Sequence, residues 1–558
     1  MSSRIAIDIE TNWRGNGSRG SPYYDDIVLI QVNDGKTIQV SDEVSDFEDL
    51  LSDPDIIKIF HNGAFDIQYL CCNAFDLRIE NVWDTMLAER LIYLGNNNIS
   101  VDLASVVQRR CDVILNKEVR ETFKGSVKGK LSQRQIEYGK EDVRYLLDIH
   151  TQQKKDVSDR NLDHIMWVEN SLAPISARMQ LIGIDFDEDI WNEMMLVEKS
   201  RIPFLERQIW DLLESSYYLD IISGQYVGTL NIDSTKQLKR AFQRLGVDIN
   251  STSESVLLGC GHPAAKVVLE YRERTKRLTW NYPKFINPFT NRIHADIYQM
   301  GARSGRFSYR DPNLQQVPKD QMFRSMFIAS PGCVFVAADY GQQEMRILAE
   351  LARCPNLISV CESQDPHLEN ARLIFNDPTI EKSDPRRDSA KNTGFALMYG
   401  SSLRGFVRGV GLTEDEARGP YSIFKKKFSR VDEWGQEQLQ FIMEYGYSLT
   451  AGGRRRHFQN VTDDPGKYAT IARNNPIQGT AADMLKLAMV YIDQKLYDRG
   501  IPGDIILCVH DEVIVETPEF YAEEVKGILE REMVRAGEHY VTVVPTIAEA
   551  IISRCWQK

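Results

Sequence analysis

Two carboxylates near the start of the chain share one face of a predicted strand. Asp8 and Glu10 lie in the run IAIDIE, and residues two apart on a strand point to the same side. Carboxylates this close repel each other unless a cation or a proton lies between them. The pair therefore indicates either a metal site or an ordinary exposed strand face.

Three further residues extend this set. Asp66 follows a short buried run and ends the segment NGAFD, and Tyr138 and Asp142 are four apart, on one side of a predicted helix. Together with Asp8 and Glu10, they resemble the three motifs of DnaQ-like 3′–5′ exonucleases. The resemblance implies an RNase H-like domain in which Asp8, Glu10, Asp66 and Asp142 bind two metal ions. It also implies that Tyr138 orients the attacking water.

The chemistry of such a site explains its residue types. Hydrolysis of a phosphodiester needs a nucleophilic water and stabilisation of the charge on the leaving oxygen. Two divalent ions about 4 Å apart supply both, and they need a cluster of carboxylates to hold them. Because every motif position is filled, we favour an active exonuclease over a decayed nuclease kept as a structural module.

A second pair of aspartates follows apolar, strand-like runs in the other half of the chain. The run 334–338 ends in Asp339, and the run 505–509 is followed by His510, Asp511 and Glu512 at the tip of a predicted hairpin. Each aspartate alone fits a turn or cap residue. If the two strand ends are neighbours, Asp339 and Asp511 converge on one pair of metal ions.

A stripe of cationic and aromatic residues lies between these aspartates in the sequence. Arg387, Lys391, Phe395 and Tyr399 recur every four residues, and a four-residue step advances only about 40° around a helix. Two cations followed by two aromatic rings suit a triphosphate below a nucleobase. An amphipathic helix with a mixed face fits the stripe equally well.

These segments resemble the motifs of family A DNA polymerases, in the family's order. The segment 339–346 (DYGQQEMR) resembles motif A, 387–400 resembles motif B, and 509–512 (VHDE) resembles motif C. Two more segments of the family resemble 304–318 and 474–483 (NNPIQGTAAD). The whole chain looks like the exonuclease–polymerase part of bacterial DNA polymerase I, the Klenow-like arrangement. This implies a multidomain α/β and α+β fold, with the exonuclease domain followed by a right-hand polymerase domain.

The resemblance implies a role for each motif residue at the polymerase site. Asp339 and Asp511 bind two Mg²⁺ ions, for which Mn²⁺ can substitute, and Glu512 supports them. Glu344 acts as a steric gate against a ribose 2′-hydroxyl, which makes DNA the expected product. The other residues expected at the nucleotide are Arg387, Lys391, Phe395, Tyr399, Gln342 and His510. Those expected to bind DNA are Arg306, Asn474, Gln478 and Arg346.

The domain boundaries follow from the same resemblance and from local patterns. We expect the exonuclease domain over 1–160 and the polymerase domain over 161–558. Within the latter, we expect the thumb at about 185–290, the palm at about 291–365 and 485–558, and the fingers at about 366–484. Local patterns predict strands at 4–9, 27–32 and 56–60, and helices over 131–150 and 191–215. They also predict a polar connection at 151–165 and a loop-rich stretch at 223–230.

Composition limits the class of protein. The chain has 558 residues with 67 Lys and Arg against 80 Asp and Glu, a net charge of −13. Taken alone, this charge argues against a chromatin-like coating protein, although local basic clusters permit DNA binding in a cleft. The nine cysteines form no CxxC pair, which argues for reduced thiols and against a zinc site. The absence of a long apolar run or signal core predicts a cytoplasmic protein without a membrane contact.

The sequence thus predicts a template-directed DNA polymerase that uses two-metal nucleotidyl transfer and 3′–5′ proofreading. Its expected partners are primer–template DNA and deoxynucleoside triphosphates, with a helicase or single-strand-binding protein as candidates. We expect no thioredoxin-type clamp. Because the chain begins at the exonuclease, we expect a bacteriophage replicative enzyme in the host cytoplasm. An organellar or plasmid replication or repair polymerase is the alternative origin.

Three other functions compete with this prediction. The first is an exonuclease whose polymerase-like half is only a DNA-binding scaffold. The second is a single-subunit RNA polymerase of the related fold, against which Glu344 and the exonuclease motifs argue. The third is a nonenzymatic DNA-binding protein, which two complete carboxylate sets disfavour.

Overall fold

The structure is a computed structural model that describes most of the chain. The described residues are 3–13, 20–74, 76–222, 224–388, 390–391, 400, 402–410 and 413–557. They divide into two compact units. Unit 1 contains 1–184, 294–317 and 329–558, and unit 2 contains 185–293 and 318–328. Each unit is described by itself.

The N-terminal part of unit 1 is built on a mixed sheet. Among the described residues its strand order is β3-β2-β1-β4-β5. The antiparallel strands are β1 (Arg4–Thr11), β2 (Ile27–Asn33) and β3 (Ile38–Ser41). The parallel strands are β4 (Ile57–Phe60) and β5 (Val82–Asp84). The predicted strands at 4–9, 27–32 and 56–60 are thus confirmed.

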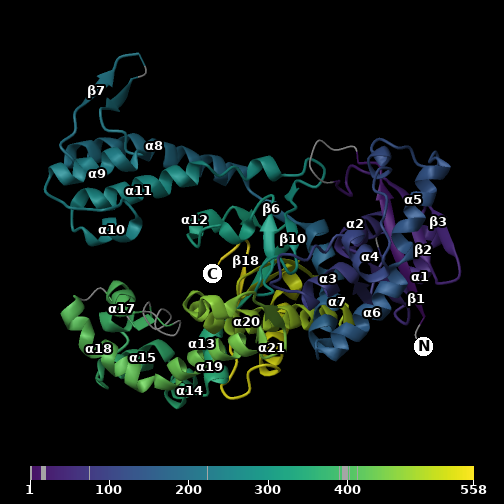
Figure 1. Ribbon diagram of the computed structural model, residues 1–558. Helices are drawn as coiled ribbons and strands as arrows, with labels where there is room; N and C mark the ends of the chain where they lie inside the picture. Colours follow the sequence, from purple (N-terminus) through teal and green to yellow (C-terminus); the bar gives the residue numbers. More distant parts are fainter. Residues whose placement is uncertain are drawn as a thin grey trace. The chain divides into compact units, whose positions relative to one another are not determined.

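The alternation of β1 decides where its carboxylates lie. Ile5, Ile7 and Ile9 are buried in a core cluster that also contains residues of α2 (Gly63–Asn73). The opposite face of β1 carries Asp8 and Glu10, because side chains alternate along a strand. This face is covered by α5 (Gln133–Arg144), which packs beside β1 and β2 (Figure 1).

The helices of this region differ from the sequence prediction at two points. The helix predicted over 131–150 is two helices, α5 and α6 (Leu146–Asp159), which meet at Tyr145. The predicted polar connection at 151–165 is wrong, because α6 runs to Asp159 and α7 (Asp163–Ile182) begins at Asp163. This polar segment is helical because a narrow stripe of its side chains is buried against the rest of unit 1. Its buried members are Gln153, Val157, Leu162 and Ile165. The other helices here are α1 (Glu48–Ser52), α3 (Thr85–Ile92) and α4 (Leu103–Cys111).

A second sheet of unit 1 carries the other aspartates. In the described part of the chain its order is β16-β17-β13-β18, and all its neighbouring strands are antiparallel. The strands are β13 (Cys333–Tyr340), β16 (Asp504–Val509), β17 (Glu512–Pro518) and β18 (Ala548–Ser553). The predicted strand and the predicted hairpin are confirmed. Two long helices pack near the sheet, α20 (Pro465–Asp498) and α21 (Ala522–Glu538).

The rest of unit 1 is mainly helical. Its helices are α13 (Gln343–Ala352), α14 (Pro355–Glu362), α15 (Pro366–Phe375), α17 (Leu403–Val410), α18 (Glu414–Lys427) and α19 (Ser429–Tyr445). Two short hairpins accompany them. These are β10 (Asp296–Tyr298) with β11 (Ser308–Arg310), and β14 (Tyr447–Leu449) with β15 (Arg455–His457).

Unit 2 is a helical body with a hairpin. Its helices are α8 (Glu188–Leu212), α9 (Thr235–Arg244), α10 (Glu254–Gly259), α11 (Pro263–Leu278) and α12 (Gln321–Arg324) (Figure 1). The helix predicted over 191–215 is confirmed as α8. The loop predicted at 223–230 is wrong, because β8 (Gln225–Gly228) pairs with β7 (Tyr217–Asp220). Tyr217 of this hairpin stacks on Trp210 of α8, with ring centroids 5.6 Å apart, which packs the hairpin against the helix.

A buried network of charges holds unit 1 together around Glu169 of α7. Arg454 donates to Glu169 Oε1 at 2.5 Å and to Asp483 Oδ1 at 2.7 Å. Lys486 donates to the same Glu169 oxygen at 2.6 Å, and Gln299 donates to the Glu169 carbonyl at 2.6 Å. Burial alone would raise the pKa of Glu169, but Lys486 and Arg454 lower it. Burial lowers the pKa of Lys486 to about 8.

Within the part of the chain that the structure describes, we find no helix that combines the length and the apolar character needed to cross a membrane.

Replacing Glu169 should destabilise unit 1 strongly. Glu169→Ala leaves two buried cations without their shared carboxylate, and breaking a buried ion pair in this way costs about 3–5 kcal/mol. We expect a loss of this size in the free energy of unfolding, measured by urea denaturation with tryptophan fluorescence.

The matched control is Glu519→Ala. Its carboxylate pairs with Arg554 on the surface, with side chains 63% and 71% exposed. An exposed pair contributes about 0–1 kcal/mol, so the control should change little. Equal losses for the two variants would contradict a central role for the Glu169 network.

Candidate active sites

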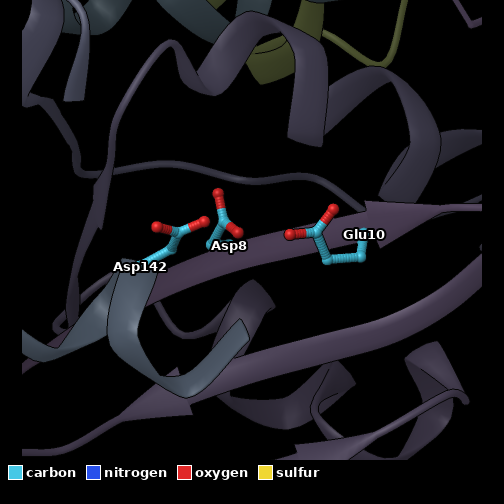
Figure 2. Close-up of side chains that lie close together, drawn as sticks. All are labelled: Asp8, Glu10 and Asp142. Atoms are coloured by element: carbon cyan, nitrogen blue, oxygen red, sulfur yellow. The ribbon is translucent and has the colours of Figure 1, made fainter. Parts of the chain in front are cut away.

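Three carboxylates come together on the face of the first sheet that α5 covers. The ligand oxygens of Asp8, Glu10 and Asp142 lie within 4.8 Å of one another. Figure 2 shows Asp8 between the other two, with Asp142 reaching toward it from α5. Asp8 and Glu10 point to the same side of β1 because side chains alternate along a strand, and Asp142 lies on the side of α5 that faces them. The three carboxylates therefore come together as the sequence predicts.

The electrostatics of this cluster favour a bound cation. Burial and the neighbouring Asp142 raise the pKa of Asp8 to about 8. Burial, then Asp8 and Asp142, also raise the pKa of Glu10, and burial raises the pKa of Asp142. Carboxylate oxygens are the ligands that hard divalent cations prefer, and a cation would offset both burial and repulsion. The residues therefore fit a divalent metal site.

Asp66 and Tyr138 lie beside this cluster. Asp66 is 3% exposed, and its Oδ1 accepts a hydrogen bond from the Ile9 N–H at 3.1 Å. Burial, followed by Asp8, raises its pKa. Asp66 is not among the three residues whose oxygens meet within 4.8 Å. The Tyr138 pKa is raised by burial and then by Asp142, which places the phenol in the field of the cluster.

Sequence reasoning missed two cations at this site. Lys117 Nζ lies 3.6 Å from Asp142 Oδ1. Lys117 and Arg120 both lower the pKa of Asp8, against the larger effect of burial. They come from a segment without regular periodicity, so no spacing signal marks them. Their charge suits a phosphate that approaches the carboxylates.

The second pair of aspartates meets at one edge of the second sheet. Asp339, in β13, is in register with Glu512 of β17. The backbone N–H of Tyr340 donates to the Asp511 carbonyl at 3.3 Å, so the turn that follows β16 lies against the end of β13. The predicted convergence of the two strand ends is thus present in the backbone.

The turn itself is shaped by His510 and Glu512. His510 has a φ of 59°, in the left-handed region that tight turns use, and it is exposed. Glu512 is 2% exposed, and its carboxylate accepts from Trp556 Nε1 at 3.2 and 3.3 Å. The indole therefore fixes the orientation of Glu512 beside the two aspartates.

The first turn of α13 carries the residues that follow Asp339. Glu344 Oε1 accepts from Arg306 Nη2 at 2.7 Å. Gln342 Nε2 lies 3.4 Å from His367 Nε2. Arg346, for which we predict a DNA contact, is only 4% exposed and donates to the carbonyls of Gly341, Cys361 and Pro545. In this structure Arg346 braces the start of α13.

The predicted triphosphate contacts lie near His367, which the sequence analysis missed. Arg387 is held by the Asp365 carboxylate at 3.0 and 3.2 Å. The pKa of His367 is lowered by burial and then by Lys391 and Arg387, so these groups are neighbours. The signal in the sequence is the run Asp-Pro-His at 365–367. Phe395 and Tyr399 lie outside the described residues.

Two of the residues predicted to bind DNA, Asn474 and Gln478, lie on α20. Asn474 and Gln478 are four apart, on one side of the helix, and both are half-buried. Arg456 donates to the neighbouring Asn475 Oδ1 at 3.0 Å. The buried Asn474 Oδ1 has no hydrogen-bond partner among the described residues, so it is available to a ligand.

Comparisons with known proteins agree with the two sites. Residues 2–158 match the family described as 3′–5′ exonuclease, and residues 213–558 match DNA polymerase family A. The chain is 31% identical to DNA polymerase I of Caldicellulosiruptor bescii over 69% of this chain and 46% of that protein. It is 30% identical to DNA polymerase I of Chloroflexus aurantiacus over 90% of this chain and 55% of that protein. The chain thus spans about half the length of these curated relatives.

A solved structure shows the same fold. The polymerase domain of Pol1 from M. smegmatis, in complex with DNA primer-template and dNTP, superposes with a TM-score of 0.82. The match covers 100% of this chain and 96% of that chain, at 22% sequence identity. The likeness shows that this chain has a known fold.

Neutralising Asp8 should stabilise the protein in the absence of divalent ions. An unfolded aspartate has a pKa near 3.9, so between about pH 4 and 8 the folded state binds more protons and stability falls as pH rises. Asp8→Asn removes this penalty. We expect the melting temperature in EDTA at pH 8 to rise by roughly 2–4 °C, the shift that 1 kcal/mol produces in a domain of 150–250 residues.

The same melting experiment also compares how the wild type and Asp8→Asn respond to Mn²⁺. Mn²⁺ should raise the melting temperature of the wild type and have much less effect on Asp8→Asn. The control is Asp34→Asn, in an exposed turn, which should respond to Mn²⁺ as the wild type does. An undiminished Mn²⁺ response in Asp8→Asn would exclude Asp8 as a metal ligand.

Proposed function

Because the chain belongs to DNA polymerase family A, with a 3′–5′ exonuclease part before the polymerase part, we propose that it copies DNA and proofreads its own product. The proposed reaction is template-directed addition of deoxynucleotides to a primer 3′ end. The backbone register that brings Asp339, Asp511 and Glu512 to one sheet edge is the observation that carries this proposal.

At the polymerase site, the carboxylates would hold two Mg²⁺ ions. When bound, such ions lower the pKa of the primer 3′-hydroxyl and neutralise charge on the leaving pyrophosphate. Asp339 and Asp511 supply the oxygen ligands from adjacent strand ends. Glu512, oriented by Trp556, supports the same edge. Because Asp339 and Glu512 lie in paired strands and Asp511 lies in the short turn that joins β16 to β17, the reacting groups meet with little loss of conformational freedom.

The incoming deoxynucleoside triphosphate would bind next to this edge. Arg387 and Lys391 supply cations for the phosphate oxygens, and Asp365 fixes the Arg387 guanidinium in place. His367 lies between this cationic pair and Gln342, and it offers a further donor. Glu344, held by Arg306, lies on the same helix turn as Gln342 and would border the sugar.

At the exonuclease site, Asp8, Glu10, Asp66 and Asp142 would hold the ions that activate water for phosphodiester hydrolysis. Tyr138 would orient that water through its phenol. Lys117 and Arg120 would contact the phosphate of the strand to be cut. The substrate we propose is the unpaired 3′ end of a primer.

Several more specific features of the proposed function are predicted from the sequence alone. They are the replication of a phage genome, the cytoplasmic location, the boundary near 160, and the thumb, palm and fingers limits. A helicase or single-strand-binding partner and the lack of a thioredoxin-type clamp are predictions of the same kind.

The two proposed activities should be separable by single substitutions. Asp511→Ala should abolish primer extension and spare the shortening of single strands, because it removes a ligand of the polymerase site alone. Asp8→Ala should do the reverse. The measurement is a primer-extension gel with Mg²⁺, run with and without the four deoxynucleotides.

The outcomes of this gel distinguish the competing functions. Extension with nucleotides and 3′ shortening without them support both proposed sites. Shortening without any extension would make the polymerase half a DNA-binding scaffold. Loss of both activities in Asp511→Ala would show that the two sites are not independent.

Replacing Glu344 should relax the choice of sugar. Glu344→Ala removes the side chain that borders the 2′ position and releases Arg306, so ribonucleotides should be incorporated more readily. We expect the ratio of deoxynucleotide to ribonucleotide kcat/KM to fall at least tenfold, which corresponds to about 1.4 kcal/mol of discrimination. Glu369→Ala, a half-buried glutamate of α15, is the control that should keep wild-type selection. Unchanged selection in Glu344→Ala would assign the gate to another residue.

A further inference from the structure

Gln31 is a fully buried amide beside the exonuclease carboxylates. It lies in β2 and is 0% exposed. Neither its Nε2 nor its Oε1 has a hydrogen-bond partner among the residues that the structure describes. An amide left in this condition costs about 1–3 kcal/mol, so packing alone does not explain a glutamine here.

The sheet register places this amide next to Asp8. Gln31 is the residue directly opposite Asp8 in the antiparallel pair of β1 and β2. Directly opposed residues share one face, and their Cβ atoms are about 4.5–5.5 Å apart. The Gln31 side chain therefore lies on the face that carries the carboxylate cluster.

The same amide also lies against the helix that completes the cluster. A Cβ added at Gly139 of α5 would lie 2.4 Å from Gln31 Nε2. Gly139 is the residue after Tyr138 and lies one turn before Asp142. The missing side chain at Gly139 thus makes room for the amide between β2 and the functional turn of α5.

A second buried glutamine shows what a structural amide looks like in this region. Gln153 is also 0% exposed, but its Nε2 donates to the Thr85 carbonyl at 2.8 Å and to Glu89 at 3.1 Å. Its Oε1 accepts from Trp83 Nε1 at 3.1 Å. Gln153 thus uses both ends of its amide to join elements, whereas neither end of the Gln31 amide has a partner among the described residues.

We propose that Gln31 is a positioning residue of the exonuclease site, whose amide donates a hydrogen bond to the Asp8 carboxylate when a divalent cation is bound there. The inference rests on the proposed exonuclease function. A carboxylate ligand has lone pairs that the cation does not use, and outer donors to these lone pairs orient the ligand. Gln31 occupies the position of β2 directly opposite Asp8, so its amide can serve as such a donor.

The test replaces the amide by an apolar side chain of similar size. Gln31→Met should keep or raise the melting temperature in EDTA, because it removes an unsatisfied buried group. It should lower 3′ shortening of single-stranded DNA by about 10–100-fold, the usual effect of losing an outer partner of a metal ligand. It should also reduce the rise in melting temperature that Mn²⁺ produces. Primer extension with nucleotides should be unchanged.

Two further variants keep the test decisive. Gln153→Met should lower the melting temperature and retain 3′ shortening at temperatures where the protein is folded. Gly139→Ala leaves Gln31 in the sequence but places a methyl group where the amide now lies. It should therefore reduce both shortening and the Mn²⁺ response, even if Gln31→Met does not fold.

The outcomes separate this inference from the proposed function. If the wild type shortens DNA and Gln31→Met keeps both its rate and its Mn²⁺ response, Gln31 is a packing residue and the inference is wrong. A lower melting temperature for Gln31→Met, equal to that of Gln153→Met, with shortening retained would lead to the same conclusion. If the wild type shows no shortening that Asp8→Ala removes, the proposed exonuclease function itself is wrong.

Discussion

The arrangement of unit 1 depends on the buried charges around Glu169. Arg454 and Lys486 are each 1% exposed, and both donate to one oxygen of a carboxylate that is itself fully buried. Buried charges tolerate no alternative packing, because separating them leaves an uncompensated ion in a medium of low polarity. Apolar side chains can slide past one another at lower cost. The network therefore fixes α7, the turn after β14 and α20 relative to one another.

The same network lies directly beneath residues of the polymerase site. A Cβ at Gly305 would lie 2.8 Å from Arg454 Nε, so only glycine lets this segment approach the buried guanidinium. The Lys486 ammonium lies over the ring of Phe307, 5.1 Å from the ring centroid. Arg306 stands between Gly305 and Phe307 in the sequence, and its guanidinium donates a hydrogen bond to the Glu344 carboxylate. The position of the proposed steric gate thus depends on charges that are buried beneath it.

Local periodicity was enough to predict the strands that carry the carboxylates. β1 and β13 have strong alternating or apolar runs. The alternation of β1 places Asp8 on one face of the sheet, and Asp339 lies near the end of β13. The helical state of 151–165 could not be predicted, because its polar residues hide a narrow buried stripe. The ion pair between Arg454 and Glu169 could not be predicted either, because it joins residues 285 apart in the sequence. Lys117 was missed because its segment has no regular periodicity. His367 was missed because nothing in its local pattern shows that it lies near Gln342, Arg387 and Lys391.

The two sites fix their carboxylates by different means. At the polymerase site, the pairing of β13 with β17 and the backbone hydrogen bond from Tyr340 to the Asp511 carbonyl bring the two aspartate-bearing segments together. At the exonuclease site, β1 spaces Asp8 and Glu10 by about 7 Å of rise, but Asp142 comes from a helix. Its distance depends on the side chains between β2 and α5. Small changes in that layer therefore alter the geometry of the exonuclease carboxylates, whereas backbone pairing places the segments that carry the polymerase pair.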